Sequence, residues 1–236
     1  MSAFEHNIDA VFPDWSYGHP HVLHGLIRSM KPDVCVEVGT YLGFGAAWMA
    51  QALKLNGNGH LYCIDNFGLN DRPIQGGNPR KHLEENIATL GLTDWVTILE
   101  GDSSAVEWPE KVDFAYLDGW HGYLAVLHDW KQCEARGAEC ICLDDTVQSV
   151  GPRMLTMDVR MDGDWDVLDV LRDCGLSVCM RKLPKGPITF SQENPTHPGV
   201  DLQVVTKDYQ VRHFDELSKR NRVNYAPIMH LLHKGR

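Results

Sequence analysis

The stretch "DVCVEVGTYLGFGAAWMAQAL", residues 33–53, joins a short apolar run, a glycine-rich turn and an apolar segment of helix length. A short apolar run that ends at a turn is typical of a buried strand, and the longer run after the turn is typical of a helix. Gly39, Gly43 and Gly45 let the backbone of the turn approach a ligand closely. The stretch therefore predicts a strand, a binding turn and a helix in succession.

The same alternation of short apolar runs and helix-length segments continues along the chain, which is typical of βαβ units. We expect an α/β fold with a Rossmann-like, doubly wound and mainly parallel seven-stranded sheet, helices on both faces and a C-terminal antiparallel strand. No regular element is expected over residues 147–165. The expected strands are 33–39, 60–66, 95–102, 112–118, 139–145, 176–183 and 199–207, and the expected helices are 18–30, 44–57, 79–91, 123–137 and 166–175.

Composition narrows the classes of partner. The chain has 236 residues and a formal net charge of −10, so its overall field repels polyphosphates and anionic lipid surfaces. We therefore expect no nucleic acid and no membrane as partner. The N-terminus has no basic start, and no apolar run approaches the roughly 20 residues that span a bilayer, which predicts a cytoplasmic protein. The seven cysteines lie mostly in apolar runs and are expected to be reduced core residues.

Acidic residues stand at the carboxyl end of every expected strand in the first half, where open α/β sheets bind their ligands. The first turn departs from the GxGxxG spacing of dinucleotide sites. A carboxylate beside it, Glu37, favours a positively charged nucleoside over a pyrophosphate, because opposite charges attract. Asp65 ends the second strand and is placed like an acid that accepts hydrogen bonds from ribose hydroxyls. A nicotinamide-dependent oxidoreductase on a similar sheet is the alternative.

Five motifs occur in order over about residues 33–146: "CVEVGTYLGFGAAWMAQAL", "YCIDN", "EGDSSAV", "DFAYLDGWHGY" and "CICLDDT". Together they resemble the class I S-adenosylmethionine-dependent methyltransferases. Within this class the sequence is most similar to the metal-dependent small-molecule O-methyltransferases, which include catechol O-methyltransferase and macrolide-sugar O-methyltransferases.

The resemblance implies S-adenosylmethionine as cofactor. It places the methionine portion along the first glycine turn, the ribose at the end of the second strand and the adenine at the turn after the third strand, with Trp120 either beside the adenine or in packing. The implied cofactor-binding residues are Glu37, Gly39, Tyr41, Gly43, Asp65, Asn66, Asp102, Ser103, Asp118 and Trp120.

The resemblance also implies a metal held by Asp118, Asp144 and Asp145. Three carboxylates at neighbouring strand tips repel one another unless a cation compensates, and all-oxygen ligation suits Mg²⁺, with Ca²⁺ or Mn²⁺ as other fits. His121 stands where the catechol-type enzymes have a lysine base, and imidazole can take a proton near neutral pH. The alternative for His121 is a solvated loop histidine or a cap of the following helix.

The implied activity is a Mg²⁺-dependent O-methyltransferase that acts on a small hydroxylated acceptor, such as a sugar or phenol of a secondary metabolite. A non-catalytic S-adenosylmethionine-binding protein is the other alternative.

We expect a single domain over residues 1–236: a cap segment and helix (1–32), a cofactor- and metal-binding half (33–146) and an acceptor-side half (147–236). The loop over 67–78 is expected to be a lid or a binding loop, and Trp15, Tyr17 and His19 are candidates for the rim of the acceptor pocket. A homo-oligomer is left open.

Overall fold

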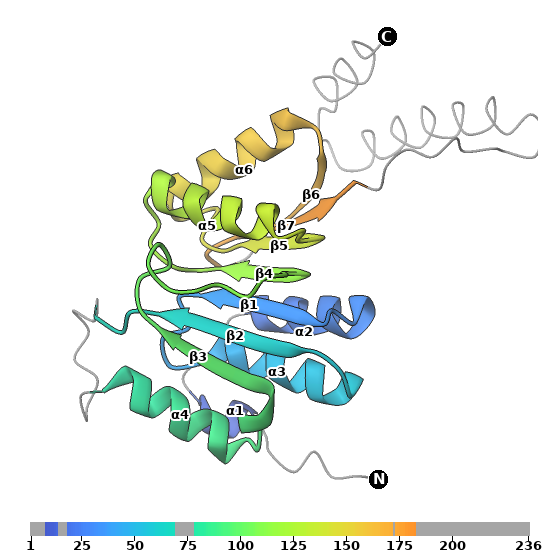
Figure 1. The fold of residues 1–236 in the computed structure, drawn as a ribbon. Helices are drawn as coiled ribbons and strands as arrows, with labels where there is room; N and C mark the ends of the chain where they lie inside the picture. Colours follow the sequence, from blue (N-terminus) through green and yellow to red (C-terminus); the bar gives the residue numbers. More distant parts are fainter. Residues whose placement is uncertain (1–7, 14–17, 69–77, 172, 183–236) are drawn as a thin grey trace, which may run out of the picture. The chain divides into compact units, whose positions relative to one another are not determined.

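The computed structural model describes residues 8–13, 18–68, 78–171 and 173–182. These residues belong to one compact unit, in which a seven-stranded sheet lies between two sets of helices (Figure 1). The expected α/β class is therefore confirmed. The single domain over residues 1–236 stays a prediction, and the expected strand at 199–207 and most of the expected lid lie outside the described residues.

The sheet has the strand order β3-β2-β1-β4-β5-β7-β6. Strands β1 to β5 pair in parallel with one another, whereas β7 runs antiparallel to both β5 and β6. The mainly parallel sheet with an antiparallel strand near its C-terminal edge is thus confirmed. The strands are β1 (Val34–Val38), β2 (His60–Asp65), β3 (Val96–Glu100), β4 (Phe114–Leu117), β5 (Cys140–Leu143), β6 (Trp165–Val170) and β7 (Leu176–Arg181).

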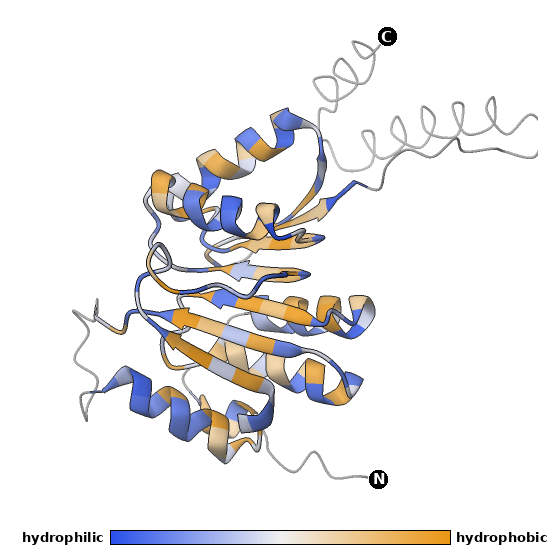
Figure 2. Ribbon diagram, in the orientation of Figure 1, coloured by the Kyte–Doolittle hydropathy of each residue, from blue (hydrophilic) through white to orange (hydrophobic). Residues whose placement is uncertain are grey.

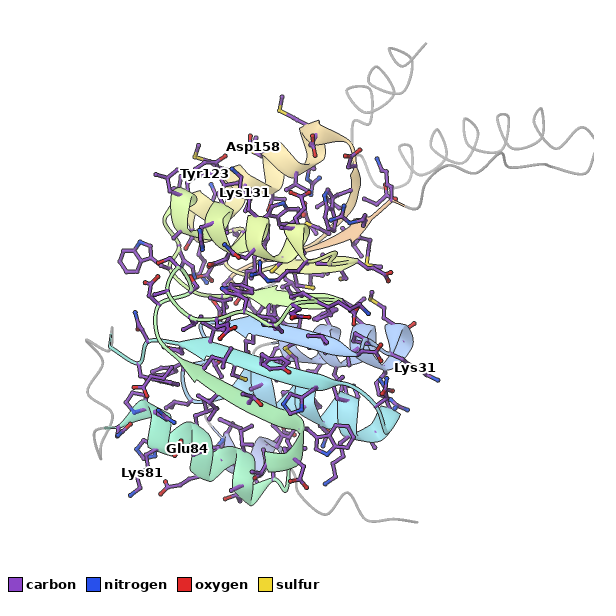
Figure 3. All side chains as sticks on the ribbon, viewed as in Figure 1. Lys31, Lys81, Glu84, Tyr123, Lys131 and Asp158 are labelled. Atoms are coloured by element: carbon purple, nitrogen blue, oxygen red, sulfur yellow. The ribbon has the colours of Figure 1, made fainter. Side chains whose placement is uncertain are left out.

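Helices cover both faces of the sheet, as expected. The first face packs against α1 (Ile8–Val11), α2 (His19–Met30), α3 (Phe44–Asn56) and α4 (Pro79–Thr89). The second face packs against α5 (Tyr123–Ala135) and α6 (Val150–Asp162), which are joined by a hydrogen bond of 2.6 Å from the Tyr123 hydroxyl to Asp158 (Figure 3). A short 3-10 turn, η1 (Thr93–Trp95), precedes β3. Among the described residues, no helix has the length and apolar composition needed to cross a membrane.

The core follows from the alternation of side chains along buried strands. In β5, Cys140 and Cys142 lie in the cluster with α1 to α4, whereas Ile141 and Leu143 lie in the cluster with α5 and α6. Because both faces are covered, the central strands are apolar along most of their length, as Figure 2 shows. All seven cysteines are buried free thiols, which confirms their expected role in the core.

The helix expected over residues 166–175 is wrong. The first five of these residues instead belong to β6 (Trp165–Val170), in which Trp165 is buried, Asp166 is exposed and Val167 is half-buried. Every residue of β6 faces a residue of β7, for example Val167 opposite Cys179. Apolar residues with helical spacing therefore form a strand here, because pairing with β7 outweighs local preference.

Helix α6 falls where no regular element was expected. Its buried positions, which include Leu155 and Val159, have helical spacing, but Met154, Met157 and Met161 are exposed apolar residues that obscure the amphipathic pattern. Pro152 lies within the first turn of α6, where a missing backbone N–H disrupts no helical hydrogen bond. The strand expected over 176–183 is confirmed as β7.

Candidate active site

The first glycine turn meets the end of β4 in the middle of the sheet. Gly39 follows β1 directly and has a φ of 87°, in the left-handed region. A Cβ atom at Gly39 would lie 2.2 Å from the carbonyl oxygen of Asp118, so only glycine fits this position. Because β1 lies between β2 and β4, the strand order reverses here, and ligands of open α/β sheets bind in such a crevice.

Asp65 at the end of β2 shapes this turn. Its Oδ2 accepts a hydrogen bond of 2.7 Å from the backbone N–H of Tyr41, and its Oδ1 accepts one of 2.8 Å from the N–H of Phe67. Tyr41 has a φ of 51°, which a non-glycine residue adopts only at a conformational cost. The acid expected to bind ribose therefore also holds the first turn in place.

Glu37 in β1 is a buried acid, 1% exposed. Its pKa is raised to about 8, mainly by burial; the charges of Asp118 and Asp65 also raise it, and the contacts with Thr40 and Cys63 lower it. Glu37 is therefore mostly neutral at pH 7. A cation beside it would favour its ionised form, which suits a positively charged ligand.

Three potential metal ligands, Asp118, His121 and Asp145, gather at the tips of β4 and β5. Their ligand atoms lie within 4.8 Å of one another. The Nε2 atom of His121 lies 3.5 Å from Oδ1 of Asp118, and its Nδ1 atom lies 3.0 Å from Oδ2 of Asp145. Two carboxylates and an imidazole at this spacing could hold a divalent cation such as Mg²⁺ or Mn²⁺.

The beginning of α6 fixes His121. The Ser149 hydroxyl lies 3.2 Å from Nδ1 of His121, and a Cβ atom at Gly151 would lie 2.2 Å from the His121 carbonyl oxygen. On the other side of the ring, Nε2 is buried and has no hydrogen bond with any described residue. Nε2 is therefore the ring atom that could bind a metal or take a proton from an acceptor.

Negative charge dominates this group. Burial raises the pKa of Asp118 to about 7; His121 lowers it, and Asp144 and Asp145 raise it. Because the Asp118 side chain is 33% exposed, solvent weakens this effect, but its direction follows from the three clustered acids. The contact with Asp118 and the charge of Asp145 raise the pKa of His121, against burial, which lowers it. A protonated imidazole or a metal ion is thus favoured here.

Asp144, the third predicted metal ligand, makes different contacts. Its Oδ1 accepts hydrogen bonds from Nδ1 of His19 at 2.8 Å and from the thiol of Cys174 at 3.4 Å. Its Oδ2 accepts a hydrogen bond of 2.8 Å from the hydroxyl of Tyr116. Burial raises the pKa of Asp144, but the bonds with His19 and Tyr116 outweigh burial and lower the pKa below its usual value. Asp144 therefore stays ionised and belongs to a separate group with His19, Tyr116 and Cys174.

His19, Tyr116 and Cys174 were not predicted as neighbours of Asp144. His19 was expected at the acceptor rim, yet it is the first residue of α2 and is 2% exposed; Trp15 and Tyr17 lie outside the described residues. No local pattern links His19 or Cys174 to Asp144, because contacts distant in the sequence bring them together. Tyr116 could have been inferred, since it stands two residues before Asp118 and so lies on the same face of the strand.

The other predicted cofactor residues form the surrounding turns. Gly43 precedes α3 with a φ of 89°, Asn66 accepts a hydrogen bond of 3.0 Å from the N–H of Gly68, and Asp102 accepts one of 2.9 Å from the N–H of Ser104. Trp120 is 66% exposed. An indole this exposed does not serve the core, so packing does not account for its position.

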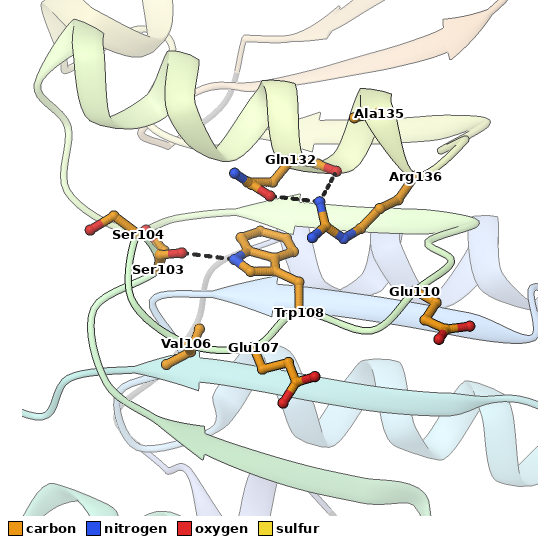
Figure 4. A pocket seen from close by; sticks show the side chains of 9 residues that line it. All are labelled: Ser103, Ser104, Val106, Glu107, Trp108, Glu110, Gln132, Ala135 and Arg136. Carbon is orange, nitrogen blue, oxygen red and sulfur yellow. Dashed lines mark hydrogen bonds between the residues drawn. The ribbon is translucent and has the colours of Figure 1, made fainter.

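Ser103 lies at the edge of a cavity of about 490 Å³ (Figure 4). Its carbonyl oxygen accepts a hydrogen bond of 2.8 Å from Nε1 of Trp108, and the guanidinium of Arg136 lies over the Trp108 ring. The nearby carboxylate of Asp129 was not predicted; burial raises its pKa to about 6, and contact with Ser103 lowers it. Ser103 is thus fixed by contacts on the side of the sheet covered by α5.

Comparisons with known proteins concern the family and the fold. Residues 36–146 match a family described as a methyltransferase domain. No curated protein sequence matches the chain. Among solved structures, a Klebsiella pneumoniae protein assigned as an O-methyltransferase has a TM-score of 0.58 at 17% identity and covers 75% of this chain and 90% of its own.

Two further solved structures are similar. The O-methyltransferase TomG from Streptomyces achromogenes, in complex with S-adenosylmethionine, has a TM-score of 0.55 at 15% identity over 74% of this chain and 86% of its own. An O-methyltransferase from Bacillus cereus, in complex with S-adenosylhomocysteine, has a TM-score of 0.55 at 15% identity over 74% of this chain and 90% of its own. At these identities the likeness concerns the fold.

The strand order and the mainly parallel sheet give this chain the same fold as these methyltransferase structures. The residues that match the methyltransferase-domain family, 36–146, run from within β1 to just beyond β5.

Proposed function

We propose that the chain is a Mg²⁺-dependent O-methyltransferase that uses S-adenosylmethionine to methylate a hydroxyl of a small molecule, such as a sugar or phenol of a secondary metabolite. The observation that carries this proposal is the group of Asp118, His121 and Asp145 directly beside the first glycine turn. The O-methyltransferases among the structurally similar proteins support transfer to oxygen.

The residues of the crevice fit the cofactor. S-adenosylmethionine is a cation with a ribose, and the acids that end β1 and β2, Glu37 and Asp65, match these two features in charge and in hydrogen-bond acceptors. Gly39 keeps the backbone of the turn close to Asp118, so the reactive end of the cofactor would lie near the acid group. Asp102 and Ser103 would then lie at the adenine end.

The acid group also fits Mg²⁺. Asp118 and Asp145 offer carboxylate oxygens within reach of one ion, and the uncompensated charge of the group favours a cation. Asp144 would join them only if its hydrogen bonds with His19 and Tyr116 were exchanged for the metal. When bound, S-adenosylmethionine supplies an electrophilic methyl group and Mg²⁺ supplies positive charge beside the acceptor.

The residues of the chain then have distinct tasks. In its neutral form, which a cation bound by the two carboxylates would favour, His121 takes the proton of the acceptor hydroxyl at Nε2, while Asp145 and Ser149 hold the opposite ring nitrogen. Asp118 and Asp145 orient the acceptor, and the turn at Gly39 fixes the methyl donor. Holding the two reactants in line contributes much of the rate in a displacement of this kind.

The test is methyl transfer from labelled S-adenosylmethionine to a panel of hydroxylated metabolites, followed by mass spectrometry with and without EDTA. We expect Asp118→Ala to abolish transfer and to leave cofactor binding largely intact. Asp162→Ala, at the far end of α6, is the matched control and should keep wild-type turnover.

Two results would overturn parts of the proposal. Turnover that EDTA and Asp118→Ala leave unchanged would exclude the metal role. If the protein binds S-adenosylmethionine but methylates no acceptor, and EDTA changes neither binding nor stability, the chain is the non-catalytic binding protein. Binding of NAD in place of S-adenosylmethionine would favour the oxidoreductase.

A further inference from the structure

A second group of potential metal ligands, His19, Asp144 and Cys174, lies apart from the oxygen-rich group. The three residues come from the start of α2, the end of β5 and the turn before β7. They are 2%, 7% and 8% exposed, respectively. Their donor atoms are a nitrogen, an oxygen and a sulfur, a mixture that suits zinc and similar ions rather than Mg²⁺.

The spacing of the donor atoms is close to that of a tetrahedral zinc site. The Nδ1 atom of His19 lies 2.8 Å from Oδ1 of Asp144, and the Sγ atom of Cys174 lies 3.4 Å from that oxygen and 3.5 Å from that nitrogen. With Zn–N and Zn–O bonds of about 2.0 Å and a Zn–S bond of about 2.3 Å, tetrahedral angles separate these pairs by about 3.3, 3.5 and 3.5 Å. The two pairs that include Sγ of Cys174 already match, and the distance between Nδ1 of His19 and Oδ1 of Asp144 needs to increase by about 0.5 Å.

The charges of this group also match a buried Zn²⁺. One carboxylate and one thiolate balance the two positive charges, so the occupied site has no net charge and avoids the penalty of an unpaired buried ion. On binding, the thiol of Cys174 gives its proton to solvent. His19 stays neutral but changes tautomer: Nδ1 releases the proton that it donates to Asp144 and binds the ion, and Nε2 takes up a proton from solvent.

We propose that His19, Asp144 and Cys174 form a second metal site, selective for Zn²⁺ and similar transition-metal ions, that ties α2 to the ends of β5 and β7. Among the described residues the group offers three ligand atoms, which leaves the fourth tetrahedral position to water. This site holds Asp144 out of the Asp118 and Asp145 group, and it stands whether or not the proposed methyl transfer to oxygen is correct.

The experiment uses Co²⁺ as a spectroscopic substitute for Zn²⁺ in the full chain. Binding at this site should give the near-ultraviolet charge-transfer absorption of a thiolate bonded to Co²⁺, at one equivalent, and Zn²⁺ should displace it. Cys174→Ala should abolish the absorption. Cys133→Ala, which removes another buried thiol, from α5, should retain it.

Asp144→Asn and His19→Gln give independent checks, and each should weaken Zn²⁺ binding at least tenfold by calorimetry. Circular dichroism and S-adenosylmethionine binding show that each variant is folded. The proposal is overturned if the folded wild-type protein gives no thiolate-to-cobalt absorption, because any Co²⁺ bound would then lie at Asp118, His121 and Asp145. It is equally overturned if folded Cys174→Ala keeps the absorption.

Discussion

The hydroxyl of Tyr116 donates a hydrogen bond of 2.8 Å to Oδ2 of Asp144. The same hydroxyl lies 3.5 Å from Oδ2 of Asp118. Burial and the nearby acids raise the pKa of Tyr116 well above its usual value, so the hydroxyl keeps its proton. One neutral donor thus lies between the half-buried Asp118 and the buried Asp144, at the ends of neighbouring strands, and links the oxygen-rich group to the group around Asp144.

Removal of this hydroxyl should destabilise the fold. Tyr116→Phe leaves the ionised carboxylate of Asp144 without one of its donors, and the loss of a buried hydrogen bond to a charged group lowers the free energy of unfolding by about 1–3 kcal/mol. Urea unfolding at pH 7 measures the change. Tyr62→Phe, which removes the hydroxyl of a half-buried tyrosine in β2, is the control. Equal stability of the two variants would show that the hydrogen bond between Tyr116 and Asp144 makes no net contribution to the free energy of unfolding.

Glu37 should make stability depend on pH. Its pKa is about 8 in the folded chain and near 4.5 when exposed, so the folded state binds more protons between these values. Stability attributable to Glu37 is therefore complete below about pH 4.5 and is lost as the pH rises toward 8, by up to about 5 kcal/mol. Glu37→Gln removes this titration. Between pH 5 and pH 8 the wild-type protein should lose more stability than the variant.

Two measurements complete this test. Urea unfolding at several pH values gives the two slopes, and a parallel slope for the wild type and Glu37→Gln would contradict a raised pKa. Addition of S-adenosylmethionine should flatten the wild-type slope, because a cation near Glu37 favours the ionised form and lowers its folded-state pKa.

The sequence predicts the first half of the fold well because its signals are local. The turn that begins at Gly39 and the helix that ends before Gly57 are marked by glycines whose left-handed φ the structure requires. The meeting of Asp118 and Asp145 also follows from the sequence, since β4 and β5 are parallel neighbours whose carboxyl ends share one edge.

The contacts of Asp144 could not be predicted, because packing of distant segments sets them. His19 and Asp144 stand 125 residues apart, and their hydrogen bond depends on how α2 packs against the sheet. Strand β6 was misread for a similar reason: its spacing of apolar residues fits a helix, and only β7 supplies the partner that makes it a strand. Global pairing decides both outcomes.

Gly39→Ala should damage both stability and cofactor binding. The added Cβ atom would lie 2.2 Å from the Asp118 carbonyl oxygen, at a φ of 87°. Gly137→Ala is a matched control, since Gly137 has a φ of 85° but no atom within 4 Å of the added Cβ. The control should lose only about 1–2 kcal/mol through strain. Thermal unfolding and calorimetric binding of S-adenosylmethionine compare the two variants. Similar losses of stability and affinity would show that the close approach of Gly39 to Asp118 matters no more than the strain of a left-handed φ.

His121→Ala tests the proposed base. Its Nε2 atom is buried, has no hydrogen bond with any described residue and lies 3.5 Å from Oδ1 of Asp118, so the variant removes the imidazole beside the acids. We expect kcat for the methylated acceptor to fall about 10²–10⁴-fold, the usual contribution of a general base, with S-adenosylmethionine binding nearly unchanged. His128→Ala, on α5, is the control. A decrease of less than about threefold would mean that metal and solvent remove the proton without the imidazole.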